Sequence, residues 1–118
     1  MNTADPTEIT IRLLKRALHL LASEPNEQIS YLKQLGVNPD EIALEFDDAF
    51  RRAIGTSGMG LLSKEVVAAA QPVDERLRQM TNSSTEVWTK SNLETSPEWR
   101  LLRSLAKEAL AKISETAG

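Results

Sequence analysis

The stretch LGVNPDEIALEFDDAF, residues 35–50, ends one helix, makes a turn and starts another. Gly36 suits the end of a helix, because glycine adopts the left-handed conformation without a steric penalty. Asn38-Pro39-Asp40-Glu41 follows, with a proline and acidic side chains at positions that favour a helix start. An apolar stripe at helical spacing comes next, formed by Ile42, Phe46, Ala49 and Phe50. The stretch therefore predicts two packed helices joined by a glycine turn.

Similar start signals occur on both sides of this stretch. Asp5-Pro6-Thr7-Glu8 offers an N-cap, a first-turn proline and a capping-box glutamate, so we expect a first helix that reaches Ala22. Ser23 ahead of Pro25 predicts a short second helix, and the third helix should end near Ile54, before Gly55. Thr95-Ser96-Pro97-Glu98 predicts a last helix. The side chains expected on its apolar side are Trp99, Leu101, Leu102, Leu105, Ala106, Ala109, Leu110 and Ile113.

The middle of the chain is less regular. GTSGMG, residues 55–60, is rich in glycine, and we expect a mobile connection there between two helical halves. A stripe at helical spacing then passes through Pro72, which favours one kinked helix over two separate helices. Residues 81–85 predict a polar loop, and residues 86–93 are too short a segment to assign. The chain as a whole, residues 1–118, predicts a single-domain all-α bundle of about five helices, with a kinked or broken helix near Pro72.

Composition excludes several classes of function. Hydrophobic residues make up 41% of the 118, charged residues make up 26%, and the net charge is −3, as in an ordinary globular protein. This balance implies neither a nucleic-acid partner nor a membrane partner, and no apolar run is long enough to span a bilayer. The absence of cysteine excludes disulfides and cysteine-ligated zinc. The first ten residues show no charged segment followed by an apolar run, so we expect a cytoplasmic protein.

The turn at Gly36 has the outline of a helix-turn-helix, the motif that places its second helix in the major groove of DNA. Here that second helix carries five carboxylates. They are Asp40, Glu41, Glu45, Asp47 and Asp48. Phosphate contacts, which provide most of the affinity for DNA, come from cationic and amide donors rather than from carboxylates. DNA binding therefore remains a disfavoured alternative.

The same carboxylates raise the question of a metal site. Glu41, Glu45 and Asp48 share one stripe of a helix, and three carboxylates in a row can hold Mg²⁺. The Glu45-x-x-Asp48 spacing resembles one half of the ExxE plus ExxD arrangement of the all-helical nucleotide pyrophosphatases, which implies metal-dependent hydrolysis of nucleotides as an alternative function. No second helix of this chain supplies the paired ExxE, so the four-carboxylate site cannot be mapped onto it.

Other catalytic patterns are incomplete. Gly55 and Gly60 match the glycines of a phosphate-binding loop, but Leu61 stands where that loop needs a lysine. His19, the only histidine, lies among cations on the polar side of the first helix. We therefore nominate no catalytic residue and no cofactor, and we expect a non-enzymatic protein.

The distribution of charge along the chain suggests protein association rather than catalysis. Cations group on the first helix, whereas carboxylates group on the third. Salt-bridged rims of neighbouring helices would account for this layout. The alternative is a contact with a basic protein partner or with another copy of the chain, in which charge steers the encounter and Leu44 anchors it. We predict such an interaction or regulatory module, of an immunity or antitoxin-like kind, with Glu41, Leu44, Glu45 and Asp48 as its partner-binding residues.

Overall fold

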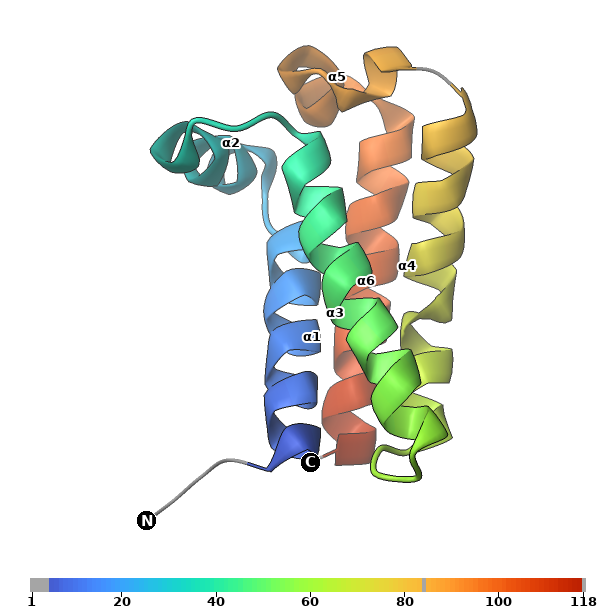
Figure 1. Ribbon diagram of the computed structural model, residues 1–118. Helices are drawn as coiled ribbons and strands as arrows, with labels where there is room; N and C mark the ends of the chain where they lie inside the picture. Colours follow the sequence, from blue (N-terminus) through green and yellow to red (C-terminus); the bar gives the residue numbers. More distant parts are fainter. Residues whose placement is uncertain (1–4, 84, 118) are drawn as a thin grey trace.

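Four long helices lie side by side, and each runs opposite to its neighbours (Figure 1). The computed structural model describes residues 5–83 and 85–117. The four helices are α1 (Pro6–Ala22), α3 (Asp40–Gly58), α4 (Lys64–Ser83) and α6 (Pro97–Ala117). α1 packs against α3 and α6, and α4 packs against the same two helices. The described chain is therefore an up-down-up-down bundle, which confirms the all-α fold class.

Shorter helices close one end of the bundle. They are α2 (Pro25–Leu35), the 3-10 helix η1 (Thr85–Trp88) and α5 (Lys90–Thr95). Figure 1 shows α2 lying across the ends of α1 and α3, and α5 lying above α6. The opposite end holds the turn between α3 and α4, beside the N-terminus of α1. We call these two regions the capped end and the turn end.

Most helix boundaries follow the expected local chemistry. The Asp5 carboxylate accepts a hydrogen bond from the Glu8 amide at 2.9 Å, and the Ser96 hydroxyl accepts one from the Trp99 amide at 3.3 Å. Ser23 is an exception, because its hydroxyl donates to the His19 carbonyl and so completes the end of α1. The residue before α2 is Glu24, which makes no side-chain cap. The expectation that Ser23 starts α2 was wrong.

Two segments expected to be loops are helical instead. α3 continues past Gly55 to Gly58, since the Thr56 hydroxyl donates to the Arg52 carbonyl at 2.8 Å and the Thr56 side chain is buried against α1. The connection between α3 and α4 is correspondingly short. α4 continues through residues 81–83, where the Thr81 hydroxyl donates to the Leu77 carbonyl at 2.9 Å. The rest of the expected polar loop includes Ser84, which lies outside the described residues.

Pro72 lies inside α4, which is one continuous helix from Lys64 to Ser83. The proline ring is on the exposed side of the helix, so its missing amide hydrogen bond does not fall in the core. The apolar stripe expected on α4 is buried throughout. Its members are Val66, Ala70, Val73, Leu77 and Met80.

The core fills the space between the four long helices. Phe46 and Phe50 stack with ring centroids 5.4 Å apart, and Trp99 is fully buried. Leu101 was expected on the apolar side of α6, but its side chain is 45% exposed, because that position turns away from α1 and α4. None of the helices within the described residues is both long and apolar enough to cross a membrane.

Candidate functional site

The exposed side of α3 carries an isolated leucine surrounded by carboxylates. Leu44 is 52% exposed although it lies in the second turn of α3, a helix that contributes to the core. Residues three and four positions away are its neighbours on the helix surface, and all four of them are acidic. We call this set the α3 acidic surface: Asp40, Glu41, Leu44, Asp47 and Asp48.

One of these carboxylates is neutralised within the chain. Asp47 pairs with the guanidinium of Arg51 at 3.0 Å, and that hydrogen bond, with the charge of Asp47, raises the pKa of Arg51. Asp40, Glu41 and Asp48 form no ion pair with any residue that the structure describes. The α3 acidic surface therefore keeps a net negative charge around its apolar centre.

Glu45 is placed differently from the other predicted partner-binding residues. It lies on the flank of α3 that faces α1 and α2, where it accepts a hydrogen bond from the hydroxyl of Tyr31. This bond, together with burial and the charge of Glu45, raises the pKa of Tyr31 to about 12. The nearby cation Arg16 acts in the opposite direction. Glu45 thus joins α2 to α3 and is a structural as well as a surface residue.

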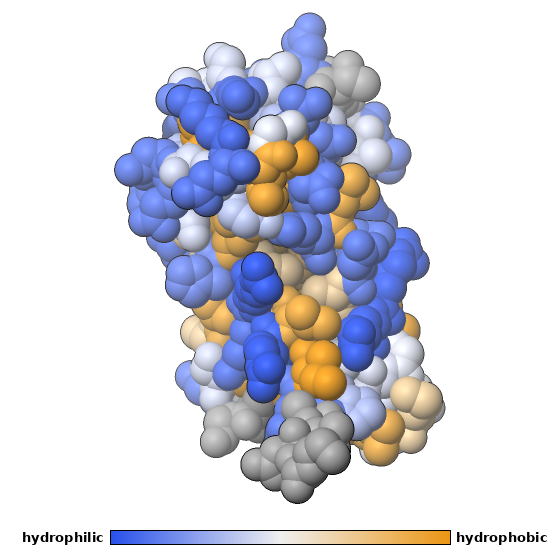
Figure 2. Space-filling model, turned by 60° about the vertical axis from the view of Figure 1, so that its left-hand side comes forward, coloured by the Kyte–Doolittle hydropathy of each residue, from blue (hydrophilic) through white to orange (hydrophobic). Residues whose placement is uncertain are grey.

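A groove of about 1030 Å³ runs along α1, beside α3. The half-buried side chains of Leu13 and Leu20 give the groove an apolar part. Asp48 and Arg52 of α3 also line it. Figure 2, in which the α1 side of the bundle comes forward, shows apolar surface along this side with hydrophilic side chains on both sides of it. Polar residues from α1, α2, α3 and α6 thus surround an apolar strip.

The carboxylates do not assemble a metal centre within the described residues. No group of three or more histidine, cysteine, aspartate or glutamate side chains there could hold a metal ion. The three carboxylates that the sequence offers for a metal, Glu41, Glu45 and Asp48, share the flank of α3 toward α1, but the Glu45 carboxylate accepts a hydrogen bond from Tyr31. The residues that a helix-turn-helix would present to DNA include Asp40, Glu41 and Leu44, all on the α3 acidic surface, whose charge repels phosphate.

Tyr31 is the residue of this region that the sequence pattern did not identify. The contact with Glu45 joins positions 14 residues apart and depends on how α2 crosses α3, so helical periodicity carries no signal for it. Comparison with models of protein families, with curated proteins and with solved structures finds no match to this chain, so its site is defined by its own geometry.

Proposed function

We propose that this protein is a non-enzymatic association module that binds a protein partner through the α3 acidic surface. The observation that carries the proposal is the half-exposed Leu44 at the centre of four carboxylates. The complementary partner surface is basic and holds an apolar recess or side chain. A regulatory or immunity-type role, in which binding alone changes the partner's activity, matches such a surface.

The two components of the surface contribute in different ways. Burial of a leucine side chain that was exposed stabilises a complex by about 1.5–3 kcal/mol, so Leu44 supplies affinity. The unpaired carboxylates Asp40, Glu41 and Asp48 raise the association rate with a cationic partner and disfavour anionic ones. This second contribution is screened by salt over roughly 10 Å at 0.1 M ionic strength. Binding should therefore weaken as the salt concentration rises.

A defined peptide tests the proposal. The probe is a synthetic amphipathic helix with a leucine flanked by lysine and arginine one turn away, titrated into isotope-labelled protein. We expect amide signals from Asp40 to Asp48 to shift during the titration. Leu44→Asp should weaken binding by at least about tenfold, which corresponds to 1.4 kcal/mol.

Leu101 provides a matched control. It is a leucine of similar exposure, 45%, on another long helix of the same bundle, and its helix neighbours are not a set of carboxylates. Leu101→Asp should leave peptide binding unchanged. The charge reversal Glu41→Lys with Asp48→Lys should abolish binding while the circular dichroism spectrum stays that of the folded protein. Equal binding by the Leu44 and Leu101 variants, or unchanged binding after charge reversal, would refute the proposed surface.

A further inference from the structure

α2 is attached to the bundle by fewer buried side chains than any of the four long helices. Of residues 25–35, all of which the structure describes, Gln28 and Leu32 are buried, whereas α1 and α3 bury five and six side chains respectively. Tyr31 packs against the core but stays partly exposed, and Leu35 is 53% exposed. Buried apolar surface is the main source of stability in a folded chain. α2 is therefore bound to the bundle less strongly than the long helices are bound to one another.

Hydrogen bonds supply the rest of this attachment. The Gln28 side chain donates to the Leu20 carbonyl of α1 and accepts from Arg103 of α6. The Tyr31 hydroxyl donates to the Glu45 carboxylate of α3. The net contribution of such bonds to stability is small, because water replaces each lost partner once the groups are exposed. Opening of α2 therefore mainly exchanges contacts within the protein for contacts with water.

The chain on both sides of α2 is suited to a hinge. Ser23 and Glu24 precede the helix in an extended conformation, with ψ of 158° and 153°. Gly36 follows it with a φ of 68°, and a glycine changes its backbone conformation without the steric penalty of a side chain. Hinges are commonly a few residues at the ends of elements. Pro39, just beyond Gly36, is buried, so the start of α3 stays in place when α2 moves.

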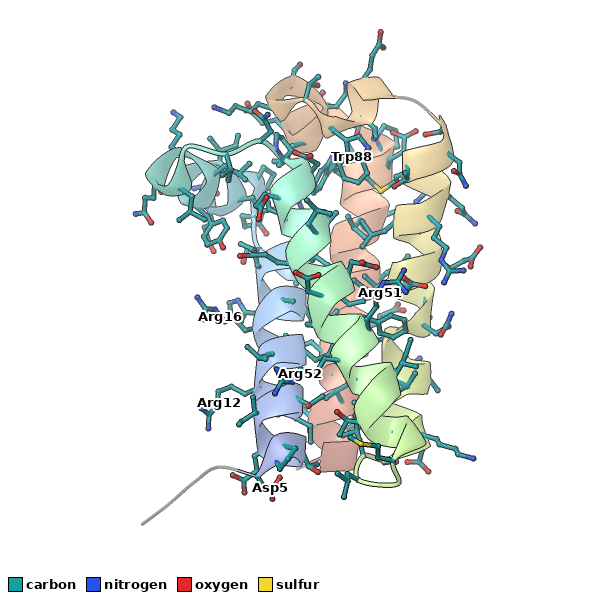
Figure 3. The ribbon with its side chains drawn as sticks, viewed as in Figure 1. Asp5, Arg12, Arg16, Arg51, Arg52 and Trp88 are labelled. Atoms are coloured by element: carbon teal, nitrogen blue, oxygen red, sulfur yellow. The ribbon has the colours of Figure 1, made fainter. Side chains whose placement is uncertain are left out.

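Opening of α2 changes the charge on the neighbouring flank of α3. Tyr31 no longer occupies the Glu45 carboxylate, and Glu41 and Asp48 lie one helical turn from Glu45 on either side. Arg16 of α1 lies on the same side of the bundle, below α2 (Figure 3), and within the described residues it does not pair with Glu45. Glu45 thus becomes a third unpaired carboxylate on this flank, next to the α3 acidic surface.

We propose that α2 is a latch, a helix that opens as a unit while the four long helices stay packed, and that its opening releases Glu45 to a basic partner at the α3 acidic surface. The second half of this inference rests on the proposed function. A partner that contacts Glu45 in the open state favours opening by the same factor by which opening strengthens its binding. The hydrogen bond between Tyr31 and Glu45 therefore opposes both opening and association.

Native-state hydrogen exchange of the full chain, followed by NMR without any peptide, tests the latch. The amides of residues 29–35 should share one opening equilibrium and be at least about a hundredfold less protected than those of residues 46–53 in α3. Tyr31→Phe keeps the ring but removes the hydroxyl, so it should speed exchange in α2 by about a further tenfold. Ser30→Ala removes an exposed hydroxyl of the same helix and should not speed it.

A substitution in the bundle distinguishes opening of α2 from unfolding of the whole chain. Val73 is fully buried in α4, so Val73→Ala should speed exchange in α3 by at least about tenfold. Exchange in α2 should not change, because its opening leaves the Val73 contacts intact. Equal protection of α2 and α3 in the wild type, or faster exchange of α2 in the Val73 variant, would overturn the latch. An unchanged α2 in Tyr31→Phe would remove that hydrogen bond from it.

The basic peptide separates this inference from the proposed function. Peptide binding should speed exchange in α2 and slow it around Leu44, and Tyr31→Phe should bind the peptide about threefold more tightly, because Glu45 is then an additional free charge. If the wild type binds the peptide but neither change occurs, Glu45 is released to Arg16 instead, and the second half of the inference is refuted while the function stands. If the wild type does not bind the peptide, the function fails and the second half fails with it, whereas exchange in the free protein still decides whether α2 opens as a unit.

Discussion

The two ends of the bundle are held by different kinds of interaction. The capped end is joined by buried side chains that hydrogen-bond across α1, α2, α5 and α6. The turn end is joined by two threonine hydroxyls of α1, which contact the Leu61 carbonyl and the Thr56 hydroxyl, and by a short backbone turn; Met59 and Leu61 are 66% and 49% exposed there. The capped end therefore depends mainly on particular long polar side chains, whereas the turn end depends more on residues that permit the backbone conformation of the turn.

Gln28 is the centre of the capped end. Its side-chain amide donates to the carbonyls of Leu20 and Leu21 at 3.0 and 3.1 Å, and its oxygen accepts from Arg103 at 3.1 Å. Arg103 also donates to the Leu93 carbonyl, and its burial lowers the pKa of the guanidinium. Carbonyls in the last turn of a helix lack the amide of a following turn as a partner. The Leu20 carbonyl also accepts from the Ser23 amide at 3.2 Å, so Gln28 adds a second hydrogen bond there and provides the partner of the Leu21 carbonyl.

The largest expected effect at the capped end is that of Trp99. Its side chain is fully buried, and its indole nitrogen donates to the Val87 carbonyl at 2.7 Å. Trp99→Ala should lower the free energy of unfolding by about 3–5 kcal/mol, because it removes both the packing and the hydrogen bond. Urea unfolding followed by circular dichroism measures the change.

Two further variants keep this prediction testable if Trp99→Ala does not fold. Trp99→Phe retains most of the ring volume and should cost about 1–3 kcal/mol, mainly from the unpaired Val87 carbonyl. Trp88 packs edge-on against Trp99, with centroids 5.8 Å apart, but is only partly buried, so Trp88→Ala should cost less than Trp99→Ala. A larger loss for Trp88 would contradict the assignment of Trp99 as the anchor of this end.

Gln28→Leu should have the next largest effect. The leucine cannot donate to the carbonyls of Leu20 and Leu21, and it leaves Arg103 with one fewer acceptor. The loss of unfolding free energy should be about 1–3 kcal/mol despite the more apolar side chain. Gln34→Leu, at an exposed position of the same helix, is the control and should change stability by less than about 0.5 kcal/mol. If Gln28→Leu instead stabilised the protein, the hydrogen bonds of Gln28 would not be needed for stability.

The sequence predicts the local part of this structure well. The clustering of carboxylates around Leu44 can be predicted from helical spacing alone, because residues three and four positions apart are neighbours on the surface of any helix. Helix starts at Asp5 and Ser96 follow for the same reason, since the capping groups and the amides that they satisfy are three residues apart.

Contacts between distant segments carry no such signal. Gln28 and Arg103 are 75 residues apart, and nothing in the pattern of α2 marks that glutamine as buried. Gly55 indicated a helix end, yet α3 continues because Thr56 is buried against Thr10, 46 residues away. Tyr31 and Glu45 are close only because α2 crosses α3.

Two glycines near the turn end should respond oppositely to alanine. Gly60 has a φ of 75°, a conformation that costs an L-residue about 1–2 kcal/mol, so Gly60→Ala should lower the free energy of unfolding by that amount. Gly55 lies within α3, and a Cβ added there would meet nothing within 4 Å, so Gly55→Ala should raise it by about 0.4–1 kcal/mol. Thermal unfolding compares the two proteins. If both substitutions changed the free energy of unfolding in the same direction, backbone conformation would not explain the stability of this end.

The smallest expected effect concerns the hydrogen bond between Tyr31 of α2 and Glu45 of α3, near the capped end. Tyr31 is the only tyrosine, so ultraviolet absorbance reports its ionisation directly, and the midpoint should lie at about 12 rather than at the ordinary 10.0. The raised pKa means that the folded protein favours the protonated phenol, so this contribution to stability is complete below pH 10 and disappears as the pH rises through about 12. Glu45→Gln keeps an acceptor but removes the charge, and it should move the midpoint back toward 10.0. A wild-type midpoint at the ordinary value would mean that Glu45 is free of Tyr31, in which case its carboxylate would belong with the unpaired acids of the α3 acidic surface.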